Sequence, residues 1–179
     1  MKRTVITVLL VACSLIIVAF MFLPGEMRLL GRPVWHTPKR LIDYELDGPG
    51  TNNQVFDIYT FSHVTHGIIF YNIWRYLGYR DDLSVYISVT AEILWELFEN
   101  TPFIINRYRK KFARYGGDSI VNIIGDVIFT VLGVYLAYLS PRLAAIYLVL
   151  SEIVLYPFRA NFLYLSIGSL LGDWSSLKI

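Results

Sequence analysis

Residues 118–139 read DSIVNIIGDVIFTVLGVYLAYL, an apolar run whose only charged residues are Asp118 and Asp126. An α-helix rises about 1.5 Å per residue, so about 20 residues cross a hydrocarbon core about 30 Å thick. The run is therefore long enough to span a bilayer. Asp118, Asn122 and Asp126 are spaced at i, i+4 and i+8, which places them on one stripe of a helix. This pattern predicts a membrane-spanning helix with a polar stripe in its first half.

The composition of the whole chain is typical of a membrane protein. Of its 179 residues, 55% are hydrophobic and 17% are charged, whereas soluble domains are about 45–50% apolar and about 25% charged. The formal net charge of +2 is too small to indicate a nucleic-acid partner, so membrane lipids are the expected partners. A single cysteine, Cys13, excludes an intrachain disulfide and a cysteine-based metal site. The composition argues against a soluble enzyme and against a disordered regulator.

Other apolar runs extend this prediction to the rest of the chain. We expect an all-α fold, a polytopic membrane protein with about five transmembrane helices plus a short C-terminal re-entrant or interfacial helix. The predicted spans lie near residues 5–23, 61–79, 83–98, 118–139 and 143–158, with extramembrane segments at 24–60 and 100–117, in a single membrane domain, 1–179. The first run could also be a signal peptide, but its length and the lack of a small-x-small cleavage site favour an uncleaved anchor.

Polar residues gather at one end of several predicted spans. Two histidines open the second span and three glutamates follow the same face of the third, at helical spacing: His63 and His66, then Glu92, Glu96 and Glu99. Alternating spans place these ends on the same side of the membrane as the stripe in 118–139. The spacing therefore predicts a one-sided polar cavity.

Ionisable groups inside a membrane cost about 2.5–3.5 kcal/mol each on insertion scales, so this cavity needs compensation. One compensation is a bound divalent metal, and the other is pairing with arginine. Carboxylate and imidazole ligands suit zinc, manganese or iron, and an all-oxygen subset suits magnesium or calcium. The predicted metal ligands are His66, Glu96, Glu99 and Asp118. The predicted catalytic residues, which would activate water or a substrate hydroxyl, are His63, His66, Glu96, Glu99 and Asp118.

A second set of residues is predicted to bind substrate. It consists of Arg107, Arg109, Asn122 and Arg159. The arginines would neutralise a phosphate group. The basic stretch 107–114 could instead contact lipid headgroups, and Asn122 beside Gly125 could serve close helix packing. Glu152 lies outside the polar stripes, which favours a structural role.

Several motifs closely resemble an uncharacterised family of bacterial inner-membrane proteins that is known only as a domain of unknown function. The motifs are HVTHG at 63–67, EILWELFENTPFII at 92–105, RYR at 107–109 and YGGDSIVN at 115–122. Residues 118–125 are also similar, over a shorter match, to a helix motif in VanZ-like membrane proteins. The family resemblance implies a membrane architecture, location in the cell inner membrane and importance of the motif face. It implies no reaction.

Two functional hypotheses remain. The first is a membrane-embedded, metal-dependent enzyme that acts on a lipid or lipid-linked substrate. The second is a non-catalytic role in ion or proton translocation, or in assembly of a membrane complex. Translocation would need polar residues through the whole membrane, whereas spans 61–79 and 118–139 are apolar in their distal halves, which favours the enzyme. The signals for orientation conflict: basic residues place the motif face in the cytoplasm, but the MKR start places it outside.

Overall fold

The computed structural model describes residues 7, 52, 54–110, 115 and 117–171, with side chains up to residue 166. The elements in these residues are helices: α2 (Thr60–Tyr76), α3 (Asp81–Glu99), α4 (Pro102–Tyr108), α5 (Ile120–Leu139), α6 (Pro141–Leu155), the 3-10 turn η2 (Tyr156–Phe158) and α7 (Phe162–Leu171). The predicted all-α class is confirmed for the described part of the chain. The predicted span at 5–23 and most of the segment 24–60 lie outside the described residues.

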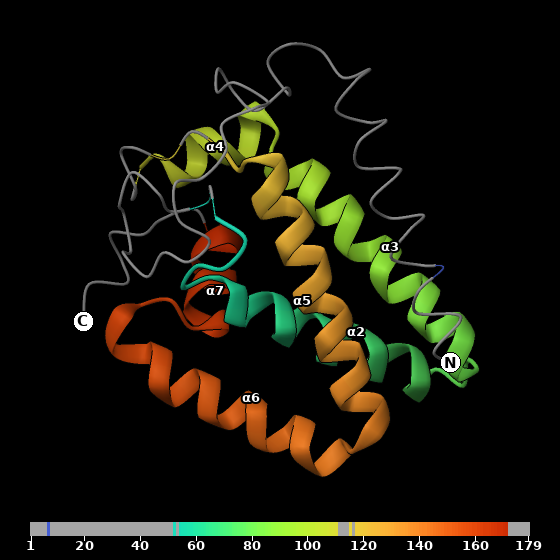
Figure 1. Cartoon of the computed structure of the whole chain (residues 1–179). Helices are drawn as coiled ribbons and strands as arrows, with labels where there is room; N and C mark the ends of the chain where they lie inside the picture. The colour runs from blue at the N-terminus through green and yellow to red at the C-terminus, as the bar shows by residue number, and fades with distance from the viewer. Residues whose placement is uncertain (1–6, 8–51, 53, 111–114, 116, 172–179) are drawn as a thin grey trace.

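The contact between α2 and α5 is the most extensive in the described part of the molecule, and α3 packs against both helices (Figure 1). Glycines let the two backbones approach closely. A Cβ at Gly67 of α2 would collide with the carbonyl of Thr130, and one at Gly133 of α5 would collide with the carbonyl of Val64. The Thr130 hydroxyl also donates to the His63 carbonyl at 3.0 Å. This crossing fixes the first half of α2 against the middle of α5.

Aliphatic residues from these three helices form one continuous core beside the crossing. Its most deeply buried members are Ile68, Val85, Val89, Ile123, Val127 and Val134. These side chains pack α2, α3 and α5 against one another through van der Waals contacts.

Short capping motifs set the helix ends. At the start of α5, the Ser119 hydroxyl accepts a hydrogen bond from the backbone N–H of Asn122. Ser140 ends α5 and caps α6, because its hydroxyl accepts from the Leu143 amide and Pro141 occupies the first position of α6. Arg159 ends η2 in the left-handed conformation, with φ 54°. The chain thereby reverses direction before α7.

Two of the described helices are long and apolar enough to cross a membrane. They are α5 and the continuous segment Pro141–Phe158, with mean hydropathies of 2.1 and 1.4. Only 11% of the second segment is buried, compared with 56% of α5. Helix α2, with 17 residues, is shorter, and α3 carries charged groups. This is weak evidence for membrane association, and the prediction of five spans stays a prediction.

The helix boundaries agree with the sequence pattern in most places and differ in one. The predicted short C-terminal helix is present as α7, Phe162–Leu171. Segment 100–117, predicted as an extramembrane loop, begins with the short helix α4. Pro102 occupies the first turn of α4, where a missing backbone N–H costs nothing, so this proline starts the helix instead of preventing it.

Candidate metal centre

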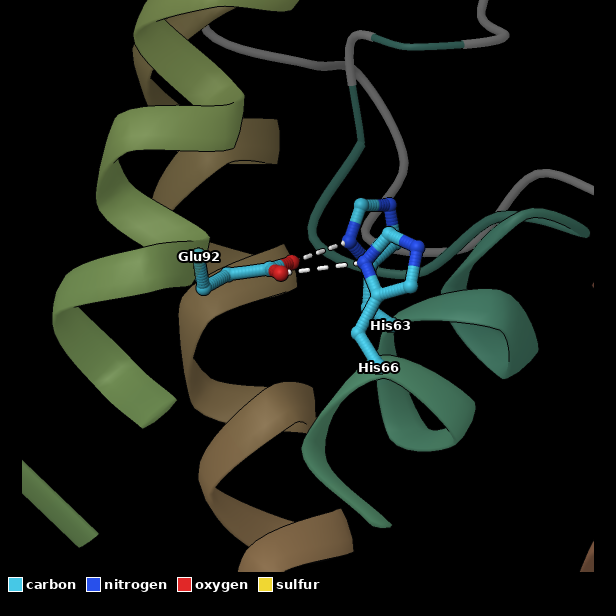
Figure 2. Close-up of side chains that lie close together, drawn as sticks. All are labelled: His63, His66 and Glu92. Carbon is cyan, nitrogen blue, oxygen red and sulfur yellow. Dashed lines mark hydrogen bonds and ion pairs between the residues drawn. The ribbon is translucent and has the colours of Figure 1, made fainter. Parts of the chain in front are cut away.

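The side chain of Glu92 points toward two histidines, His63 and His66 (Figure 2). This side chain reaches from α3 to the first turns of α2, where Oε1 lies 2.6 Å from His63 Nδ1 and Oε2 lies 3.0 Å from His66 Nδ1. Glu92 has 0% exposure, and the two histidine side chains have 10% and 13%. Both carboxylate oxygens of Glu92 are therefore occupied by imidazole N–H groups in a nearly dry environment.

Two further carboxylates approach the same histidine. Oε1 of Glu96 lies 3.5 Å from His63 Nδ1, and Oδ1 of Asp126 lies 3.6 Å from His63 Nε2. Glu96 and Asp126 are 2% and 3% exposed, and these two oxygens have no hydrogen-bond partner. A buried polar atom without a partner costs about 1–3 kcal/mol, and more when it is charged. A stable fold that retains two such atoms in one place therefore points to a ligand.

The two arrangements are groups that could each hold a metal ion. One consists of His63, His66 and Glu92 and the other of His63, Glu96 and Asp126, with the ligand atoms of each group within 4.8 Å of one another. Imidazole nitrogen with carboxylate oxygen suits zinc, manganese or iron. The groups share His63, so the centre is one continuous cluster built from α2, α3 and α5.

Aromatic rings surround the imidazole of His66. Phe70 stacks on it at a centroid distance of 5.5 Å, while Trp95 and Phe162 meet it edge-on at 6.1 and 5.4 Å. These rings come from α2, α3 and α7, so the last described helix reaches the cluster. The rings limit access of water to His66 and would strengthen electrostatic interactions inside the cluster.

A second buried acidic group lies between the end of α3 and the start of α5. The Asn100 amide donates to Asp118 Oδ2 at 2.8 Å, and the Asp118 backbone N–H donates to Asn100 Oδ1 at the same distance. The Tyr115 hydroxyl donates to the Asp118 carboxylate at 3.2 Å. Asp118 precedes α5, and burial raises its pKa to about 6. The neighbouring Asp57 raises this pKa too, while the hydrogen bonds from Asn100 and Tyr115 and the charge of His63 lower it.

The structure brings together only part of the predicted metal set. His66 and Glu96 lie in the two metal-capable groups, whereas Glu99 and Asp118 belong to neither of the groups found among the described residues. Their places are taken by Glu92 and Asp126, together with His63 from the predicted catalytic set. Glu92 and Asp126 do belong to the polar helical stripes that the sequence spacing predicted. The metal-binding and catalytic roles of all these residues stay predictions.

The predicted substrate-binding residues have the following surroundings. Arg109 donates from Nε to the Tyr115 carbonyl at 2.8 Å, and the guanidinium of Arg107 lies 5.7 Å from the ring centroid of Phe103. The Asn122 amide donates to the Gln54 carbonyl at 2.9 Å. This bond ties α5 to the chain before α2, and the substrate-binding role of Asn122 stays a prediction.

Arg159 and Glu152 lie on either side of the turn that leads to α7. The left-handed conformation at Arg159 is the backbone feature that reverses the chain. The Glu152 carboxylate accepts from the Asn161 amide at 2.7 Å and from the Leu163 backbone N–H at 3.3 Å. Glu152 therefore holds the first turn of α7 against α6, in keeping with the structural role expected for it.

The fold and this cluster define an all-helical protein with a buried, metal-capable His/Glu/Asp centre. The family model described as "Protein of unknown function (DUF2585)" matches residues 28–172. The chain belongs to this family, which confirms the resemblance to an uncharacterised family. The similarity to VanZ-like proteins stays a prediction.

Relatives of the chain are UPF0314 proteins of bacteria. The protein of Sphingopyxis alaskensis is 41% identical over 46% of this chain and 46% of the relative. The protein of Novosphingobium aromaticivorans is 36% identical over 54% of each, and that of Brucella anthropi is 34% identical over 71% of this chain and 67% of the relative. The chain thus spans about half the length of the first two relatives. No solved structure matches the chain.

Proposed function

We propose that this chain is an integral protein of the cell inner membrane whose buried centre is a metal-dependent active site for a lipid or lipid-linked substrate. The observation that carries the proposal is the pair of unpartnered carboxylate oxygens, on Glu96 and Asp126, that face one histidine in a nearly dry bundle. A divalent cation would offset both charges. Bound there, it would supply Lewis acidity and an activated water.

The outer surface of the bundle supports a membrane location. Helix α6 exposes a set of large apolar side chains: Leu143, Ile146, Val149, Leu150, Ile153 and Val154. Monomeric soluble proteins rarely expose contiguous apolar patches of this kind. At about 1.5 Å per residue, α2 and α3 are about 25–29 Å long, close to the thickness of a hydrocarbon core. Hydrocarbon chains are therefore the surroundings that we propose for these helices.

The position of the polar cluster favours an enzyme over an ion pathway. His63 lies in the first turn of α2, and the apolar core of Ile68, Val89 and Val134 lies further along the same bundle. Translocation would need polar groups on both sides of the cluster. A centre closed by apolar side chains on one side can accept a substrate headgroup and exclude bulk water.

The proposed substrate class follows from the surroundings of the centre. Aromatic rings around His66 and the apolar face of α6 suit hydrocarbon chains. The arginines at 107, 109 and 159 would supply positive charge for a phosphate in the headgroup. In this proposal the cluster residues position the headgroup and one carboxylate or histidine moves a proton.

A lipid analysis in the bacterium of origin tests the proposal. We expect a strain that lacks the protein to accumulate one lipid or lipid-linked species and lose another, as measured by mass spectrometry of lipid extracts. The wild-type gene should restore the profile, Glu96→Gln should not, and Glu152→Gln, as a matched control outside the cluster, should. Identical lipid profiles with and without the protein would contradict the enzymatic function.

Reporter fusions test the membrane architecture. Fusions in the segment 100–117 and at the C-terminus should report the same compartment, because the predicted ends of the spans share one face. Opposite compartments for these two fusions would contradict the one-sided arrangement. The result also determines which headgroups the centre can reach.

A further inference from the structure

The interatomic distances in the cluster distinguish hydrogen bonds from pairs of atoms that could bind the same ion. Two ligand atoms on a tetrahedral ion with bonds of about 2.0–2.2 Å lie about 3.3–3.6 Å apart. The 2.6 Å between His63 Nδ1 and Glu92 is too short for this arrangement and is the length of a strong hydrogen bond. The separation of 3.6 Å between His63 Nε2 and Asp126 Oδ1 falls in the ligand range. Glu96 completes this group, because the ligand atoms of His63, Glu96 and Asp126 lie within 4.8 Å of one another.

The hydrogen bonds of Glu92 also fix which histidine atoms can bind a cation. A neutral imidazole has one N–H and one lone pair, so donation from Nδ1 to Glu92 leaves the lone pair on Nε2. In His63 this Nε2 faces Asp126 Oδ1. A carboxylate that accepts from one ring nitrogen while the other nitrogen binds a metal is the common arrangement around metal-bound histidine.

From this geometry we propose that the divalent cation is bound by His63 Nε2, Glu96 and Asp126, and that Glu92 positions both histidines without binding the cation. The inference rests on the metal dependence of the proposed function. Three protein ligands leave one position of a tetrahedral ion for water or substrate, which is the pattern of catalytic zinc sites. His66 then lies beside the open position instead of binding the cation.

The packing around His63 supports this assignment. Thr130 donates to the His63 carbonyl, and the adjacent glycine crossing of α2 and α5 keeps the imidazole close to Asp126. Two of the three proposed ligands are therefore held by the most extensive helix contact of the described chain. Ligands held in this way lose little entropy when the ion binds.

Metal analysis of the full-length protein in detergent tests the assignment. We expect wild type loaded with Zn²⁺ or Co²⁺ to hold one ion per chain after removal of excess metal. Asp126→Asn and Glu96→Gln should retain less than about a tenth of it. Glu92→Gln should still bind one ion, with an affinity about 10–100-fold weaker, which is the usual effect of removing a partner of a metal-bound histidine. Glu152→Gln should match wild type.

A positioning role for Glu92 also has a spectroscopic signature. At saturating Co²⁺, the Glu92→Gln variant should keep the absorption bands of wild type, because its three ligands are unchanged. Loss of the ion in Glu92→Gln together with full retention in Asp126→Asn would overturn the assignment in favour of the group His63, His66 and Glu92. That outcome would leave the proposed metal dependence intact.

Wild type alone provides a second test that does not depend on folding of the variants. Electron spin echo modulation of the Mn²⁺-loaded protein should show one coordinated imidazole nitrogen. Two coordinated imidazoles would overturn the assignment. A wild-type protein that binds neither Zn²⁺, Co²⁺ nor Mn²⁺ would instead contradict the metal dependence of the proposed function.

Discussion

The two buried acidic groups of this molecule use similar residues in opposite ways. Around Asp118, donors from Asn100 and Tyr115 meet the carboxylate at hydrogen-bond distance. Around His63, one oxygen each of Glu96 and Asp126 has no hydrogen-bond partner. Buried polar groups that serve only the fold are almost always hydrogen-bonded. From this difference we propose that the Asp118 group serves the fold and that the His63 group binds a ligand.

The largest expected effect comes from the helix crossing that builds the His63 group. Replacing Gly67 with valine would force its side chain into the carbonyl of Thr130, so α2 and α5 would have to separate. We expect a loss of about 3 kcal/mol or more in the free energy of unfolding, which is the upper range for overpacking. Thermal unfolding in detergent measures it. Ile73→Val, at an exposed position of the same helix, controls for a valine in α2, and an equal loss in both variants would contradict the crossing.

The next effect concerns the Asp118 group. Asp118→Ala leaves the amide of Asn100 and the hydroxyl of Tyr115 buried without their acceptor. We expect the free energy of unfolding to fall by about 1–3 kcal/mol, while the metal content per folded chain stays at the wild-type value. Loss of the metal from a correctly folded Asp118→Ala protein would remove the distinction between the two groups.

A smaller effect of opposite sign is expected in the His63 group. In metal-free protein, Asp126→Asn replaces a buried carboxyl group, one oxygen of which has no hydrogen-bond partner, with a neutral amide of the same size. The variant should be as stable as metal-free wild type, or more stable by about 1 kcal/mol. Thermal unfolding with a chelator present makes the comparison. Destabilisation as large as that of Asp118→Ala would mean that Asp126 serves the fold.

A separate expected effect is a change in the pH dependence of stability. Burial is the main cause that raises the pKa of Asp118 from its ordinary value of 3.8 to about 6. Between these two values the folded protein binds more protons than the unfolded protein, so stability falls as pH rises from about 4 to about 6 and is then constant with respect to this group. Asp118→Asn should reduce this fall, as measured by the unfolding temperature across that range. An unchanged pH profile would contradict the assignment of the fall to Asp118.

The sequence predicted the helices more completely than the site. Apolar runs at 61–79 and 83–98 correspond to α2, Thr60–Tyr76, and α3, Asp81–Glu99, because long apolar segments with helical spacing have few alternatives. The same spacing placed Asp118 and Asp126 on one stripe. It could not show which of them meets His63, since they lie about 12 Å apart along a helix axis.

That choice depends on where α2 crosses α5. The close approach at Gly67 and Gly133 sets the crossing and brings His63 beside Asp126. Local periodicity carries no information on the depth or angle of a helix crossing, because these depend on side chains from both helices. Gly67 lies six residues into 61–79 and Gly133 fifteen residues into 118–139, so the sequence did not pair these two glycines.

The central claim is that the unpartnered oxygens of Glu96 and Asp126 face a divalent cation. The most direct measurement is the metal content of the full-length protein purified in detergent, determined by elemental analysis of wild type and Asp126→Asn side by side. We predict one ion of zinc, manganese or iron per wild-type chain, and less than about a tenth of that metal content in the folded variant. A folded wild-type protein that contains no such ion and binds none when one is supplied would contradict the claim.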